Sequence, residues 1–151
     1  MIITLAGMFS ACANKVDVAK EEEQVRELWN KVSEYGMKGD WENYKKYFDQ
    51  TEKLQIIHPG AADWLKGWDE FSARYKVMLE SGNTWTEHKN DLLNVNISKS
   101  GDMAWGIADF TFSFPSNPEQ KYHMWEAVVF EKIDGEWKSV MGMACSVPNA
   151  E

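Results

Sequence analysis

The spacing of the apolar residues changes near residue 83 from the period of a helix to the period of a strand. Before that point apolar residues return every three or four positions, as at Val25, Leu28 and Val32. After it they alternate with polar residues, as at Val95 and Ile97. Side chains repeat about every 3.6 residues on a helix and about every two on a strand. Helices are therefore predicted first and consecutive strands after them, the order of an α+β domain.

Two helices are predicted at the start of the folded domain. Asp17 caps the first, over 17–35, because its carboxylate can accept from backbone N–H groups that the first turn leaves free. Gly36 and Gly39 are predicted to end this helix. Asp40 caps a second, shorter helix.

The middle of the chain is predicted to hold a short strand and a third helix. The strand covers 54–57 and stops at Pro59-Gly60, while the helix follows Gly67 and ends at Gly82. Four long strands then run to the C-terminus, with a proline-containing loop over 115–120 between the second and the third. These strands cover 85–98, 103–114, 121–133 and 136–147.

Length and charge limit the function classes. A chain of 151 residues with 44% hydrophobic residues suits one domain with one core. Its 16 Lys and Arg against 24 Asp and Glu give a net charge of −8. Nucleic acid is not expected as a partner, because a phosphate-binding surface needs clustered cations.

Residues 1–12 are predicted to be a processing signal and 13–16 a tether before the domain at 17–148. The signal is uncharged and apolar, too short to span a bilayer. Its end, Phe9-Ser10-Ala11-Cys12, resembles the lipobox of bacterial lipoproteins, in which the cysteine is lipidated. That resemblance implies export to the periplasm or the cell surface, with membrane contact only through a lipid anchor on Cys12. The alternative is an apolar leader without a role in export.

The second of the two cysteines, Cys145, lies in the apolar last strand. With Cys12 lipidated, no intrachain disulfide can form. Cys145 is therefore expected to be a small buried core residue.

Six short motifs in a fixed order resemble the SnoaL-like branch of the nuclear-transport-factor-2-like superfamily. The resemblance covers about 17–148 and implies a cone, in which three helices pack inside a strongly curved antiparallel sheet. It also implies a pocket at the open end and a homodimer through the convex face of the sheet. The motifs are Gly39-Asp40-Trp41, Tyr47-Phe48, Ile57-His58-Pro59, Trp64-Leu65-Lys66-Gly67, Gly101-Asp102-Met103-Ala104-Trp105 and Asp134-Gly135-Glu136-Trp137-Lys138.

His58 is the candidate general base. In the ketosteroid isomerase branch of the superfamily a carboxylate before a proline has this role, and His58 stands at the matching position. That branch also needs two oxyanion donors, which would fall near Val32 and near Ala127 or Val129. None of these side chains donates a hydrogen bond, so ketosteroid isomerase activity itself is not expected.

Two further polar positions on the strands are open to two interpretations. Asp109 is either a pocket carboxylate with a raised pKa, and then a second catalytic residue, or a residue of the dimer face. His123 and Trp125 share one strand face and line either the pocket or the dimer surface. Glu87 and His88 are expected to be solvated.

Eight tryptophans are more than a chain of this length usually carries. They fill an aromatic core or wall a pocket for a flat or sugar-like ligand. Trp29, Trp64 and Trp68, with His123 and Trp125, are the candidate pocket residues.

No metal or cofactor is expected. The three histidines are scattered, and the chain has no His-x-x-x-His pair, no Cys-x-x-Cys pair and no glycine-rich phosphate loop.

Three function classes remain open. The first is an exported module that binds a small apolar or sugar-like ligand in an aromatic pocket. The second is an isomerase, dehydratase or cyclase with His58 as base and Asp109 or His123 as its partner. The third is a structural dimerisation module with a filled cone.

Overall fold

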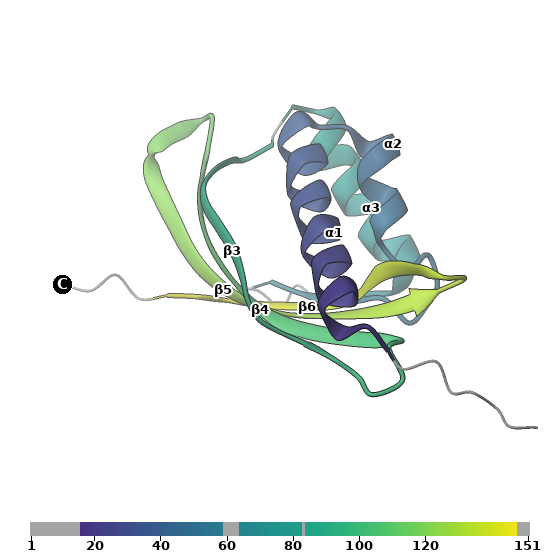
Figure 1. Ribbon diagram of the computed structural model, residues 1–151. Helices are drawn as coiled ribbons and strands as arrows, with labels where there is room; N and C mark the ends of the chain where they lie inside the picture. The colour runs from purple at the N-terminus through teal and green to yellow at the C-terminus, as the bar shows by residue number, and fades with distance from the viewer. Residues whose placement is uncertain (1–15, 59–63, 83, 148–151) are drawn as a thin grey trace, which may run out of the picture.

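The computed structural model describes residues 16–58, 64–82 and 84–147 (Figure 1). The predicted signal with Cys12, residues 13–15 of the predicted tether, and the Pro59-Gly60 stop lie outside the described residues. Within the described part of the chain, no helix combines the length and the apolar composition that a membrane span requires.

Three helices lie against one face of a six-stranded sheet, as the α+β prediction requires (Figure 1). The long hairpin of β4 and β5 curls up beside the helices, so the face toward them is concave. The helices are α1 (Val18–Lys38), α2 (Trp41–Tyr44) and α3 (Gly67–Glu80). The strands are β1 (Gln55–Ile57), β2 (Trp64–Lys66), β3 (Thr86–Ile97), β4 (Met103–Phe114), β5 (Asn117–Ile133) and β6 (Glu136–Ser146).

The sheet is mixed rather than wholly antiparallel, which corrects the prediction. Its order is β2-β1-β6-β5-β4-β3, and β1 pairs parallel to β6. The strand β2 was not predicted, because three residues are too few to show an alternating pattern. The expected loop over 115–120 is also wrong, since β5 begins at Asn117 and pairs with Phe114. Both sides of this part of β5 are exposed, so its sequence does not alternate.

The first helix begins as predicted and ends later. The Asp17 carboxylate accepts a hydrogen bond from the Lys20 N–H, 3.2 Å away. The helix passes through Gly36 and ends at Gly39, whose φ of 68° is the left-handed conformation that glycine adopts without strain. Gly36 is buried within the helix because the indole of Trp85 packs on it.

Two apolar clusters hold the helices to the sheet. One lies under α1 and joins Val25 and Leu28 to Val128 and Phe130 of the sheet. The other is aromatic and lies between α2, α3 and β1. Its buried members are Trp41, Tyr44, Phe48, Leu54, Ile56, Phe71 and Leu79.

Cys145 is exposed, which corrects the expectation of a buried core residue. It pairs with Trp125 across β5 and β6. Directly opposed residues point to the same side of a sheet, and Trp125 is 49% exposed on the side away from the helices.

Gly36→Ala should destabilise the protein although alanine favours a helix by about 1 kcal/mol. A Cβ at this position would lie 2.5 Å from ring atoms of Trp85 and 3.3 Å from Tyr44, so a rigid indole must move. Overpacking of this kind costs about 1–3 kcal/mol. Chemical denaturation of the variant and of Gly36→Ala/Trp85→Phe measures the effect. The penalty should be smaller with the smaller ring, and equal penalties in both backgrounds would show that Trp85 is not its cause.

Candidate functional site

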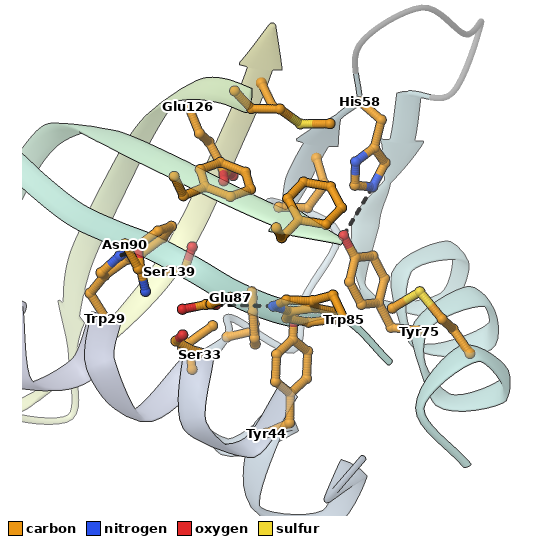
Figure 2. Close-up of a pocket in the computed structure, with 18 of the residues that line it drawn as sticks. Trp29, Ser33, Tyr44, His58, Tyr75, Trp85, Glu87, Asn90, Glu126 and Ser139 are labelled. Carbon is orange, nitrogen blue, oxygen red and sulfur yellow. Dashed lines mark hydrogen bonds between the residues drawn. The ribbon is translucent and has the colours of Figure 1, made fainter. Parts of the chain in front are cut away.

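A cavity of about 420 Å³ lies between the concave face of the sheet and the helices (Figure 2). Eleven of its 23 lining residues carry Phe, Tyr or Trp rings. The helices supply rings such as Trp29 and Tyr75, and the strands supply Phe110 and Phe112. A cavity with this lining is typical of a small-molecule site.

The cavity exists because small residues surround one carboxylate of the sheet. Glu126 of β5 pairs with Ala108 of β4 and with Ala144 of β6, in a row that faces the helices. Gly142, which pairs with Val128 on the same face of the sheet, leaves further space, since a Cβ there would lie 2.3 Å from Oε1 of Glu126. Larger side chains at these positions would fill the hollow.

Glu126 points into this cavity without a protein partner. No hydrogen bond or ion pair joins its carboxyl to another described residue, and its oxygens are not sealed from the cavity. Burial, which penalises the charged form, raises the pKa of Glu126 to about 7. The carboxyl can therefore be neutral or ionised near neutral pH.

Glu126 was not among the site residues predicted from the sequence. The available signal was a carboxylate that alternates with Met124, Val128 and Phe130 on an apolar strand face. A charged residue in such a row is rarely buried without a reason.

His58 and Tyr75 form a second polar group on the cavity wall. Nε2 of His58 lies 3.0 Å from Oη of Tyr75, and the two rings stack with centroids 5.8 Å apart. Burial raises the pKa of Tyr75, and the charge of Glu126 contributes in the same direction. The phenol thus keeps its proton at neutral pH and donates to a neutral imidazole, whereas an imidazolium would donate to the phenol oxygen.

Two further polar residues of the cavity wall, Glu87 and Asn90, accept hydrogen bonds from tryptophans. The Trp85 indole N–H donates to Oε1 of Glu87 at 3.0 Å, and the Trp29 indole N–H donates to Oδ1 of Asn90 at 2.6 Å (Figure 2). The expectation that Glu87 is solvated is wrong. An extra residue at His88 shifts the register of β3, and Glu87 consequently turns toward the cavity.

Two predicted site residues, Trp29 and His58, line the cavity. Three others, Asp109, His123 and Trp125, do not, which corrects the pocket interpretation of each. Asp109 and Trp125 are directly opposed across β4 and β5, in a row next to the one that holds Glu126. Adjacent rows point to opposite sides of a sheet, so these side chains lie on the convex face.

On the convex face, Asp109 is held by Lys89 and His123 rather than buried in a pocket. Lys89 Nζ lies 2.7 Å from its Oδ2, and His123 Nε2 lies 2.7 Å from its Oδ1. The Lys89 hydrogen bond first, and then that of His123, lower the pKa of Asp109, opposite to the raised value expected. Asp109 is thus not a proton donor of the cavity.

Trp64 and Trp68 also lie away from the cavity. Trp64 is 51% exposed in β2, where its indole donates to Oε1 of Gln55 at 2.7 Å. Trp68 stacks on Trp41 in the aromatic cluster, with ring centroids 5.8 Å apart. One is a surface residue and the other a core residue.

Among the described residues, no three His, Cys, Asp or Glu side chains gather closely enough to hold a metal ion. The cavity instead offers one unpartnered carboxyl, one imidazole–phenol pair and a largely aromatic wall.

A comparison with protein families matches residues 25–149 to the model of the SnoaL-like domain. The chain belongs to the SnoaL-like family. A comparison with curated proteins finds no match.

Solved structures of the NTF2-like superfamily share the fold of this SnoaL-like domain. A proposed dehydratase from Streptomyces avermitilis is 19% identical with a TM-score of 0.71, over 86% of this chain and 98% of that one. A superfamily protein from Salmonella enterica is 19% identical with a TM-score of 0.68, over 88% and 95%. A protein of unknown function from Shewanella oneidensis is 21% identical with a TM-score of 0.66, over 82% and 97%. At these identities the likeness concerns the fold alone, which hosts many functions.

Glu126→Gln should stabilise the SnoaL-like domain at about pH 8 and leave its stability at about pH 4 unchanged. The folded-state pKa of about 7 lies above the ordinary 4.5, so the folded protein loses stability as pH rises from 4.5 through 7. The full difference is about 3 kcal/mol, at about 1.4 kcal/mol per pKa unit. Urea denaturation across this pH range measures it, with the exposed Glu80→Gln as control. Parallel stability curves for native protein and Glu126→Gln would contradict the assignment.

Proposed function

We propose that this SnoaL-like domain binds a small, mostly apolar molecule in the cavity beside Glu126. The observation that carries the proposal is the half-open, largely aromatic cavity of about 420 Å³. Pockets for small molecules usually measure about 300–1,000 Å³ and combine apolar walls with a few polar groups. Burial of an apolar molecule there contributes about 25 cal/mol per Å² removed from water.

The wall favours an apolar ligand over a sugar-like one. A sugar needs many hydrogen-bond partners, and several of the polar groups here already bond to each other, as Trp29 does to Asn90 and Trp85 to Glu87. The carboxyl of Glu126 and the His58–Tyr75 pair then fix the orientation of one polar group of the ligand.

A second candidate is an enzyme of the isomerase, dehydratase or cyclase type. The observation that favours it is a carboxyl with a pKa of about 7 in the same cavity as His58, because proton transfer is most efficient when the pKa lies near the working pH. Glu126 takes the place that Asp109 had in the sequence-based hypothesis. The proposed dehydratase from Streptomyces avermitilis has the same fold. Only this candidate requires that the bound molecule be converted.

The proposed partner on the convex face is a second copy of the chain. Trp105 and Trp125 are 45% and 49% exposed there, with Ile107 and Met143 beside them. Large contiguous apolar patches are uncommon on monomers. Asp109, which is directly opposed to Trp125 on this face, is paired with Lys89, and this reduces the repulsion between two copies of a chain with net charge −8.

Export and a lipid anchor on Cys12 complete the proposal. The support is the sequence of residues 1–12 alone, which resembles a lipobox segment. A tether there leaves the cavity of the folded domain free to take up molecules outside the cytoplasm.

The neutral dye N-phenyl-1-naphthylamine should bind to the SnoaL-like domain with increased fluorescence and quench the tryptophans of the cavity. Ala144→Phe should abolish binding, because Ala144 lines the cavity and a phenyl ring would occupy the space beside Glu126. Thermal unfolding confirms that the variant folds, and Ala127→Phe on the convex face is the matched control. Equal dye binding by both variants would contradict the proposal that the ligand binds in this cavity.

Sedimentation velocity at micromolar concentration should give a dimer for the native domain and a monomer for Trp105→Glu. A charge in the middle of the apolar patch would have to be buried unpaired in the dimer. The variant should still bind the dye, since Trp105 does not line the cavity. A monomeric native domain would contradict the proposed partner.

A further inference from the structure

The cavity wall combines carboxylates with aromatic rings. Glu87 projects from β3 and Glu126 from β5, so two carboxyl groups reach the same cavity. Of these, Glu87 already accepts from the Trp85 indole, whereas Glu126 has no partner among the described residues. The acceptor capacity of Glu126 is therefore available to a ligand.

Aromatic rings lie within electrostatic reach of this carboxyl. Tyr44 and Tyr75 line the same cavity as Glu126; burial is the main cause that raises the pKa of each phenol, and the charge of Glu126 contributes in the same direction. Phe110 lies two residues beyond Ala108 on β4, on the same face of the sheet as Glu126, and also lines the cavity. The face of an aromatic ring carries negative charge density, which attracts cations.

We propose that the ligand of this cavity is an apolar organic cation, an ammonium compound whose charged group lies against Glu126 and the surrounding rings. This inference rests on the proposed binding function and adds its chemical class. A carboxylate supplies the counter-charge, ring faces replace the water shell of the ammonium group, and the apolar remainder fills the rest of the cavity.

The one Arg of the cavity wall does not neutralise this carboxyl. Arg74 of α3 acts on Tyr75, whose pKa it lowers, while burial alone accounts for the shift at Glu126. The cation is thus expected beside Glu126.

Binding of a cation should be linked to loss of a proton from Glu126. A positive charge beside the carboxyl favours its ionised form, so the affinity rises with pH up to a folded-state pKa of about 7 and is constant above it. The other titratable groups that line the cavity are Tyr44, His58, Arg74, Tyr75, Glu87 and Tyr122. The ordinary pKa of a histidine also falls in this range, so the pH dependence is assigned to Glu126 only where Glu126→Gln removes it.

The test compares benzyltrimethylammonium with its neutral isostere neopentylbenzene. The two have the same shape, and the ammonium compound has no proton to lose, so any pH dependence comes from the protein. Binding to the full folded protein is measured between about pH 5 and pH 8 at constant ionic strength, by tryptophan quenching and by calorimetry in two buffers of different ionisation enthalpy. Glu126→Gln is the variant, and Glu80→Gln, outside the cavity, is the control with the same change in charge.

The expected result is tighter binding of the cation than of the isostere at about pH 8, with release of a proton near pH 7. Below pH 7 the affinity for the cation should fall by up to about tenfold per pH unit, while that for the isostere stays constant. Glu126→Gln should weaken cation binding at high pH by about tenfold and leave isostere binding intact. Glu80→Gln should match the native protein.

The failures of this inference and of the proposed function are distinguishable. Equal or tighter binding of neopentylbenzene at every pH, or the same cation affinity in Glu126→Gln and Glu80→Gln, would overturn the cation inference and leave a cavity for neutral molecules. Binding of N-phenyl-1-naphthylamine without binding of the cation would also overturn the cation inference and leave a cavity for neutral molecules. No binding of the cation, the isostere or the dye would overturn both.

Discussion

The register of the central strands is the constraint on which the rest of this structure depends. It aligns Ala108, Glu126 and Ala144 in one row on the helix side of the sheet and Asp109, Trp125 and Cys145 in the neighbouring row on the other side. A shift by one residue would exchange the two rows. The cavity would then receive Asp109 and an indole, and the carboxyl of Glu126 would lie in water. The position of the chemistry thus follows from hydrogen bonding between backbones.

The helices turn this concave row into a cavity. The aromatic cluster around Phe71 and Tyr44 fixes α2 and α3 at one end of the sheet, and Val25 and Leu28 fix α1 along it. Between these two packed regions, no helix side chain fills the space over the small residues of the sheet. The domain is therefore closely packed on both sides of the cavity and hollow at Glu126.

A buried carboxyl without a partner opposes folding, because its charged form loses hydration and gains no hydrogen bond. A domain of this size is only marginally stable. A glutamine or an apolar residue would fit the same row at a lower cost. Stability does not explain a glutamate at position 126, whereas the proposed binding of a ligand to the carboxyl would explain it. Asp109 on the convex face is the opposite case, since one carboxylate oxygen pairs with Lys89 and the other forms a hydrogen bond with His123.

The local sequence determined the helices and strands and the order in which the family-like motifs follow one another. The spacing of apolar residues and the cap at Asp17 are short-range effects, so the three helices, the hairpin at Asp134-Gly135 and the α+β class followed from the sequence alone. Only the tertiary structure decided which strand face meets the helices, because both faces of these strands carry apolar residues and alternation cannot distinguish them. That decision placed Trp29 and His58 at the cavity, excluded Asp109, His123, Trp125, Trp64 and Trp68 from it, and revealed Glu126 and Glu87. The bulge at His88 and the parallel pairing of β1 with β6 are long-range features, since they depend on partners far away in the chain.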